Sequence, residues 1–274
     1  MLTVAFTTGE QMKEQYLGDV SDYRKYALLR ALTEGTGLSL GVCWMLTPDD
    51  SRSDGNKLEF LANPAKWRTF DPKLFDLLTG IVAKPESRRL AAIEQNGMLG
   101  QQTVFFDQLL SDDGATRRIY FAEANRRLKK CDLVFFDPDN GLEVASVPKG
   151  RKNSSKYLYF DEAAEIWESG VSMLIYQHYT RESRQAFEAR LAGRLIAVLP
   201  SCQISMFATA HALFILAAQP RHVDRFNGAS AEIAATWPDW FIATISADSL
   251  LASEVPSPRE LDAVKRTGGT RTRR

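Results

Sequence analysis

The sequence predicts a single α/β domain of three layers, with a mostly parallel sheet that ends in an antiparallel hairpin. Three observations predict this fold class. Apolar runs of strand length alternate with amphipathic segments of helix length. The last two apolar runs are separated only by residues 208–211, which is typical of a hairpin. The chain has 274 residues, 45% of them hydrophobic, which is enough for one large core.

The first elements expected along the chain alternate between helix and strand. A helix is capped by Asp19 or Ser21. Residues 38–46 are an apolar run that predicts a buried strand, and residues 67–70 are a weaker strand candidate. Asp71 followed by proline is a helix start, because proline is favoured at the first helical position.

The later elements continue this alternation. We expect strands at residues 104–106, 133–136 and 171–176, helices at 116–130, 162–169 and 184–195, hairpin strands at 202–207 and 212–217, and a helix near 229–235. Strands separated by helices run parallel, so their carboxyl ends gather at one edge of the sheet. In such sheets, ligands bind in the crevice at that edge.

Domain limits follow from where this pattern begins and ends. Residues 1–11 carry little pattern and are expected to form an extension, whereas residues 12–255 form the single α/β domain. Residues 256–274 are expected to be a basic, disordered tail.

Composition excludes several protein classes. Lys and Arg total 34 and Asp and Glu total 34, so the chain is not a broadly basic nucleic-acid coat. The three cysteines form no Cys-x-x-Cys pair, which argues against a zinc ribbon and a thioredoxin-type site. No apolar run approaches the roughly 18 residues of a membrane span. We therefore expect a cytoplasmic protein with no membrane partner.

The segment that follows residues 133–136 is the sharpest candidate for a reacting site. Asp137, Pro138, Asp139 and Asn140 come directly after four apolar residues. Amino-group methyltransferases place an Asp-Pro-Pro-Tyr motif at such a strand end to hold a target amine. Phosphohydrolases with an Asp-x-Asp motif use the first Asp as nucleophile beside Mg²⁺. A capped turn without chemistry is the third interpretation.

A second candidate lies in the first predicted helix. Asp22 and Lys25 are three residues apart and share a face of that helix, just after Gly18. The acids could instead cap the helix and favour its positive end.

Together these segments resemble the ribosomal RNA adenine-N6 methyltransferases, a branch of the Rossmann-like S-adenosylmethionine (AdoMet)-dependent enzymes. The likeness covers residues 16–220 in pieces. It implies a Rossmann-like methyltransferase sheet, AdoMet as cofactor and nucleic acid as substrate. By this resemblance the residues near the cofactor are Gly18, Asp22, Lys25, Asp71 and Asp107, and the transfer centre is Asp137, Pro138, Asp139 and Asn140.

The chain departs from this family at two places. The glycine-rich turn after the first strand is replaced by Met-Leu-Thr-Pro-Asp-Asp-Ser-Arg-Ser-Asp-Gly, whose only glycine is Gly55. Asp139 and Asn140 stand where the motif has its second proline and its aromatic residue.

Two alternative functions stay open. Asp49, Asp50, Asp54, Asp137 and Asp139 could form the oxygen-rich site that Mg²⁺ prefers, in a phosphohydrolase or nuclease. The chain could also be a catalytically inactive, methyltransferase-like binding module, because a fold does not determine a function.

A basic loop downstream predicts contact with a substrate. Lys149, Arg151 and Lys152 alternate with small and aromatic residues, a pattern that suits the backbone of RNA or DNA. His178 and Arg181 follow the next strand and are expected to contact the same substrate.

Overall fold

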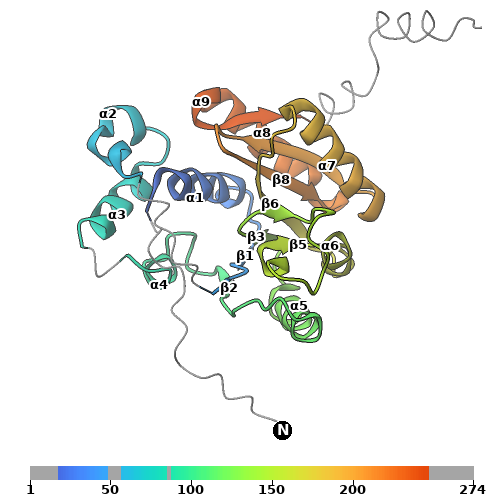
Figure 1. Cartoon of the computed structure of the whole chain (residues 1–274). Helices are drawn as coiled ribbons and strands as arrows, with labels where there is room; N and C mark the ends of the chain where they lie inside the picture. The colour runs from blue at the N-terminus through green and yellow to red at the C-terminus, as the bar shows by residue number, and fades with distance from the viewer. Residues whose placement is uncertain (1–17, 49–56, 85–87, 247–274) are drawn as a thin grey trace, which may run out of the picture.

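The structure, a computed structural model, describes residues 18–48, 57–84 and 88–246 (Figure 1). The predicted extension 1–11 and tail 256–274 lie outside these residues. So do three acids of the proposed magnesium site, Asp49, Asp50 and Asp54.

A seven-stranded sheet forms the centre of the described chain, in the order β2-β1-β3-β6-β8-β7-β9. Its strands are β1 (Leu40–Cys43), β2 (Val104–Phe106), β3 (Leu133–Phe136), β6 (Ser172–His178), β7 (Gln203–Ala208), β8 (Ala212–Ala218) and β9 (Ala243–Ile245). β2, β1, β3 and β6 are parallel, as predicted. The α/β class is therefore confirmed, with a parallel core.

The antiparallel end of the sheet is larger than predicted. β7 and β8 form the expected hairpin, but β8 lies between β6 and β7 and is antiparallel to both. β9 then pairs with β7 and becomes the edge strand. The sequence did not predict β9, because it has three half-buried residues and no alternation to mark it. The sheet is therefore mixed, with a mostly parallel core and antiparallel strands at one end.

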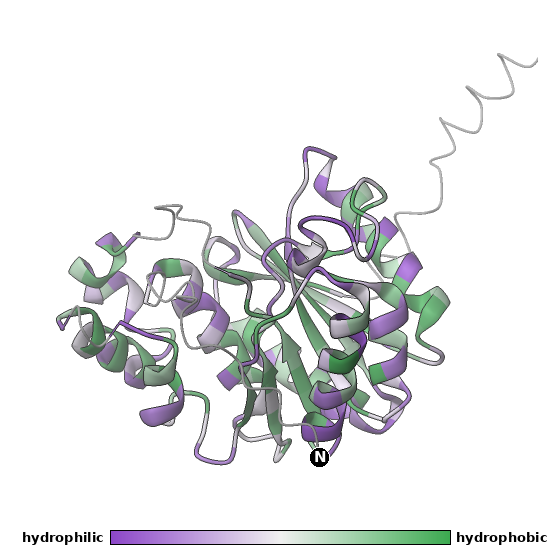
Figure 2. Cartoon of the chain, turned by 60° about the horizontal axis from the view of Figure 1, so that its bottom comes forward, coloured by the Kyte–Doolittle hydropathy of each residue, from purple (hydrophilic) through white to green (hydrophobic). Residues whose placement is uncertain are grey.

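Helices cover both faces of the sheet, and a buried apolar cluster lies under each layer. Figure 2 shows the strands in the green of hydrophobic residues between these helices. One layer contains α1 (Val20–Thr33), α8 (Val223–Thr236) and α9 (Asp239–Ile242), and the other contains α5 (Gly114–Leu128), α6 (Phe160–Trp167) and α7 (Arg184–Val198). Five of these six helices agree with the apolar patterns of the sequence. The sixth, α9, was not expected.

A helical insertion connects β1 to β2 and lies beside α1, away from the sheet (Figure 1). It contains η1 (Glu59–Ala62), α2 (Pro64–Trp67), α3 (Pro72–Val82) and α4 (Ala91–Gln95). The strand predicted at residues 67–70 is wrong. Pro64 starts a helix there, and Trp67 and Phe70 pack into an aromatic cluster with Phe241 instead of pairing with a strand.

The described chain also contains four short elements: β4 (Gly141–Leu142), which pairs in parallel with β5 (Tyr157–Leu158), and the 3-10 turns η3 (Ser154–Lys156) and η4 (Pro220–His222). None of the helices described is long and apolar enough to cross a membrane.

Candidate functional site

The candidate site lies where the order of the parallel strands reverses. β1 pairs with β2 on one side and with β3 on the other, so the chain leaves β1 and β3 in opposite directions along the sheet. In open α/β sheets, ligands bind at such a point, outside the carboxyl ends of the strands. The Asp137 backbone N–H donates to the Cys43 carbonyl at 3.1 Å, which places the predicted turn directly beside the end of β1.

Lys25 and Asp137, 112 residues apart in sequence, form an ion pair at this point. Lys25 Nζ donates to Asp137 Oδ2 at 2.7 Å and lies 3.4 Å from Asp22 Oδ1. The two paired side chains are only 12% and 16% exposed. The structure thus brings together the start of α1 and the turn after β3, two segments that the sequence analysis treated as separate candidates.

Burial and charge act together on this group. Burial raises the pKa of Asp137, and the Lys25 charge opposes that rise. For Lys25, burial alone would lower the pKa, but Asp137 and Asp22 raise it well above its usual value. Lys25 therefore stays an ammonium and is not a nucleophile.

Asp19 places another carboxylate at the start of α1. Its Oδ1 accepts from the backbone N–H groups of Ser21 and Asp22, as an N-cap does. Burial, with a contribution from Asp22, raises the pKa of Asp19 to about 6. The Gly18 N–H donates to Asp22 Oδ2 at 2.9 Å and so holds the Asp22 side chain in place.

Gln177 of β6 holds the turn after β3 by hydrogen bonds. Its Nε2 donates to the Asn140 carbonyl, and its Oε1 accepts from the Leu142 N–H. Gly141 has φ of +116°, and a Cβ there would lie 2.4 Å from the Gln177 amide. Only glycine fits this position. The Pro138 carbonyl accepts no hydrogen bond from the described residues, and Pro138 is buried.

Asp139 joins the same turn to the segment that follows β1. Thr47 Oγ1 donates to Asp139 Oδ2 at 2.9 Å, and Lys156 Nζ lies 3.8 Å from the same oxygen. This contact connects the two loops that border the crevice.

Sequence reasoning missed Tyr176 in β6. Its ring centroid lies 5.5 Å from Lys25 Nζ, and the ring of Tyr26 lies 5.7 Å away, so two aromatic rings adjoin the ammonium. The Tyr176 hydroxyl is 3.4 Å from His178 Nε2, at the end of the same strand. Burial, followed by the Lys25 charge, lowers the pKa of His178. The one sequence signal for Tyr176 is its spacing from His178. The two residues are two apart in a strand and therefore share a face.

The segment after β1 has no glycine among its described residues, but its backbone makes a glycine-like turn. Met45 has φ of +48°, a conformation that a bulky residue rarely adopts. The turn also explains why β1 is shorter than the predicted strand 38–46. The Trp44 N–H donates to the Phe106 carbonyl, so this turn lies beside Asp107 at the end of β2.

Asp71 is not brought to this group. It caps α3 by accepting from the Leu74 N–H, and Arg30 Nε donates to its other oxygen at 2.5 Å. Both contacts are structural, so a cofactor role has no support from its surroundings.

The basic loop is anchored firmly. Asp112 accepts from the N–H groups of Asn153 and Ser155, while the buried Arg117 donates to Glu162 and to the Ser154 carbonyl. Among the three predicted cations, Lys149 is bound to Asp161 and Glu162.

Three of the other predicted substrate contacts are exposed cations. Arg151, Lys152 and Arg181 form no ion pair within the described ranges. They can therefore meet an anion without first breaking a salt bridge.

The magnesium alternative gains no support from the described residues. Among them, no three His, Cys, Asp or Glu side chains are grouped so that they could hold a metal ion. Asp137 is instead paired with Lys25. Asp49, Asp50 and Asp54 lie outside the residues that the structure describes, so the magnesium site stays a prediction.

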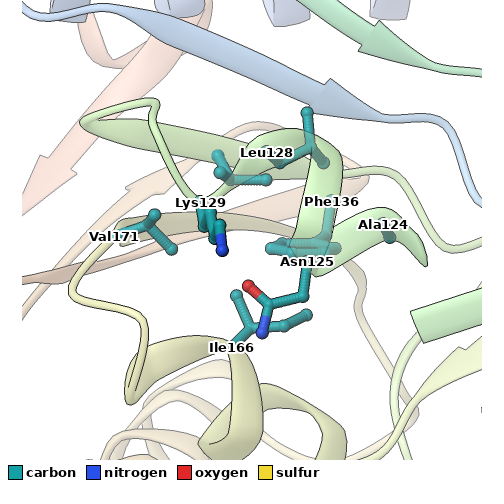
Figure 3. A pocket seen from close by; sticks show the side chains of 8 residues that line it. Ala124, Asn125, Leu128, Lys129, Phe136, Ile166 and Val171 are labelled. Carbon is teal, nitrogen blue, oxygen red and sulfur yellow. The ribbon is translucent and has the colours of Figure 1, made fainter. Parts of the chain in front are cut away.

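One gap in the packing lies elsewhere, between α5, α6 and the sheet (Figure 3). Apolar side chains such as Leu128, Phe136 and Ile166 line it, together with Asn125. It leaves no room for a water molecule, so it is a packing defect rather than a ligand site.

No protein-family model matches the chain, and no curated protein matches its sequence.

Proposed function

We propose that this chain is an AdoMet-dependent methyltransferase that acts on an amino group of a nucleic-acid base. The observation that carries the proposal is the position of the Asp-Pro-Asp-Asn turn. It leaves β3 at the reversal of strand order, beside the end of β1, and contains Asp137 next to a Pro138 carbonyl that accepts no hydrogen bond from the described residues. A strand-end motif of this kind holds the target amine in amino-group methyltransferases.

The neighbouring residues fit the cofactor in two respects. Asp107 follows β2 and is exposed, a position from which a carboxylate can accept hydrogen bonds from ribose hydroxyls. Met45 makes the left-handed turn after β1, and its side chain is buried in the apolar cluster of the α5 face rather than in the crevice. The turn is thus made without glycine.

AdoMet would supply an electrophilic methyl group, which is bonded to its positively charged sulfonium sulfur. The chain's own contribution is to hold the acceptor amine. Asp137 and the Pro138 carbonyl provide two acceptors for the two amine hydrogens, which directs the nitrogen lone pair away from them. Lys25 fixes the Asp137 carboxylate by a charge-assisted hydrogen bond. Because burial raises the pKa of Asp137, this group is also suited to receive the proton released from the methylated amine.

Calorimetric titration with AdoMet tests the cofactor, and transfer of a tritiated methyl group to unpaired RNA and DNA oligonucleotides tests the activity. We expect saturable binding, and a loss of about tenfold in affinity in Asp107→Asn, because a carboxylate acceptor for hydroxyls becomes a neutral amide. Asp224→Asn, an exposed acid of α8, is the matched control and should bind like the wild type. Absence of AdoMet binding by the wild-type chain would refute the proposal.

A further inference from the structure

The junction of α2 and α9 carries an exposed aromatic surface that the proposed site does not use. We call Lys66, Trp67, Phe70 and Trp240 the Trp240 patch. Trp240 is 43% exposed, although it is among the largest apolar side chains of the protein. Its ring meets Trp67 edge-on at 5.2 Å and Phe70 at 5.4 Å between centroids. These contacts hold the indole in place while leaving part of it open to solvent.

Lys66 adds a positive charge to this surface. Its Nζ lies 4.4 Å from the Trp240 centroid and 5.7 Å from that of Trp67. No described carboxylate pairs with Lys66, since Asp71 is bound to Arg30 and Asp76 to Arg68. The patch therefore combines a rigid aromatic face with an uncompensated cation.

The patch lies near the proposed site. Arg24 reaches it from α1, with its guanidinium carbon 5.2 Å from the Trp67 ring and Nη2 donating to the Trp240 carbonyl. The next residue, Lys25, pairs with Asp137. The two places are thus separated by about one helix diameter, roughly 10–12 Å.

Both places also belong to the same edge of the sheet. α9 leads directly into Ala243, the first residue of β9, and Ala243 pairs with Ala208 at the carboxyl end of β7. β7 runs in the direction of β3 and β6, since β8 is antiparallel to both β6 and β7. A bound strand can therefore reach both the patch and Asp137.

We propose that the Trp240 patch binds single-stranded nucleic acid, with one base stacked on Trp240 and a phosphate at Lys66. Aromatic faces accept any unpaired base, and a nearby cation neutralises the backbone. A base pair inside a duplex cannot offer its face in this way, so the patch selects an unpaired strand. The inference rests on the proposed function in that the strand would carry the amine for Asp137.

Fluorescence anisotropy with a fluorescein-labelled 12-nucleotide uridine oligomer, and with a 12-base-pair RNA duplex, tests the inference on the full-length chain. We expect tighter binding of the single strand, and a loss of about tenfold or more in Trp240→Ala. Trp240→Phe should retain most of the affinity because a stacking ring remains. Lys66→Gln should weaken binding and reduce its dependence on salt.

Ile119→Ala is the matched control, because it removes an exposed apolar side chain from α5 on the other layer. It should bind like the wild type, and melting curves of every variant will show that the fold is retained. The inference is overturned if the wild type binds no single strand, if duplex binds equally well, or if Trp240→Ala binds normally. AdoMet titration separates the two proposals. If the wild-type chain does not bind AdoMet, the proposed methyltransferase function is refuted, but the oligonucleotide result still tests the Trp240 patch.

Discussion

A polar cluster lies at each edge of the sheet, an ion-paired one at the carboxyl edge and a hydrogen-bonded one at the amino edge. At the carboxyl edge, Lys25 joins Asp22 and Asp137. At the amino edge, Ser172 Oγ lies 2.9 Å from His222 Nδ1, and His222 Nε2 lies 3.3 Å from Asp132 Oδ1. The amino-edge residues are those of a hydrolase triad, so residue types alone do not distinguish the two edges.

The surroundings distinguish the two clusters. Ser172 is fully buried, and its Oγ also accepts from the Gln219 N–H. Arg221 Nε donates to His222 Nε2, and the second oxygen of Asp132 accepts from Ser39. The amino-edge groups are thus joined by several hydrogen bonds, although the Asp132 side chain is 34% exposed. The many cross-links at the amino edge tie strands together. The Lys25–Asp137 pair instead lies at the edge where open α/β sheets bind their ligands.

The largest expected effect is on catalysis at the carboxyl edge. Asp137→Asn should reduce methyl transfer by at least about a hundredfold, because the amide loses the negative charge that orients and deprotonates the amine. Single-turnover transfer from tritiated AdoMet measures this. Asp132→Asn, the same change at the amino edge, is the control and should keep its rate. Equal losses in the two variants would erase the proposed distinction between the edges.

The next effect concerns stability at the amino edge. Ser172→Ala should destabilise the protein by about 1–3 kcal/mol, because it removes the hydroxyl that contacts His222 and the Gln219 N–H. Urea unfolding measures this difference, with the exposed Ser183→Ala as control. Methyl transfer per folded molecule should not change. A specific loss of activity in Ser172→Ala would make the amino edge a functional site.

The smallest effect is a difference in pH dependence between the edges. The folded pKa of Asp19 is about 6, above its usual 3.8, so its contribution to stability declines as pH rises from 4 to 6. Burial lowers the pKa of His222 below 6.5, so its contribution declines as pH falls below 6.5.

Urea unfolding between pH 4 and 8 tests both signs. Asp19→Asn keeps a good helix cap and should remove the decline with rising pH, and His222→Asn should remove the decline with falling pH. The change in Asp19→Asn should be on the order of 1 kcal/mol after solvent screening is considered. The same sign at both edges would contradict the assignment.

Local sequence determined most elements of the described chain. Asp19 caps α1 as predicted, because its side chain reaches N–H groups only two and three residues away. The turn after β3 was recognisable for a similar reason, since the proline and glycine restrict the backbone at their own positions. The strand predicted at 67–70 is wrong because the aromatic packing of Trp67 and Phe70 depends on α9, far away in sequence.

Only the tertiary structure decided which of these pieces meet. The sequence contains Lys25, Asp137 and Tyr176 as members of three separate patterns, and their meeting depends on the order β1-β3-β6 and on α1 crossing that edge. Strand order follows from long-range pairing and from packing on both faces, which no local pattern records. The sequence by itself therefore determined the elements and the acid that ends β3, and the packing decided that a lysine holds this acid at the crevice.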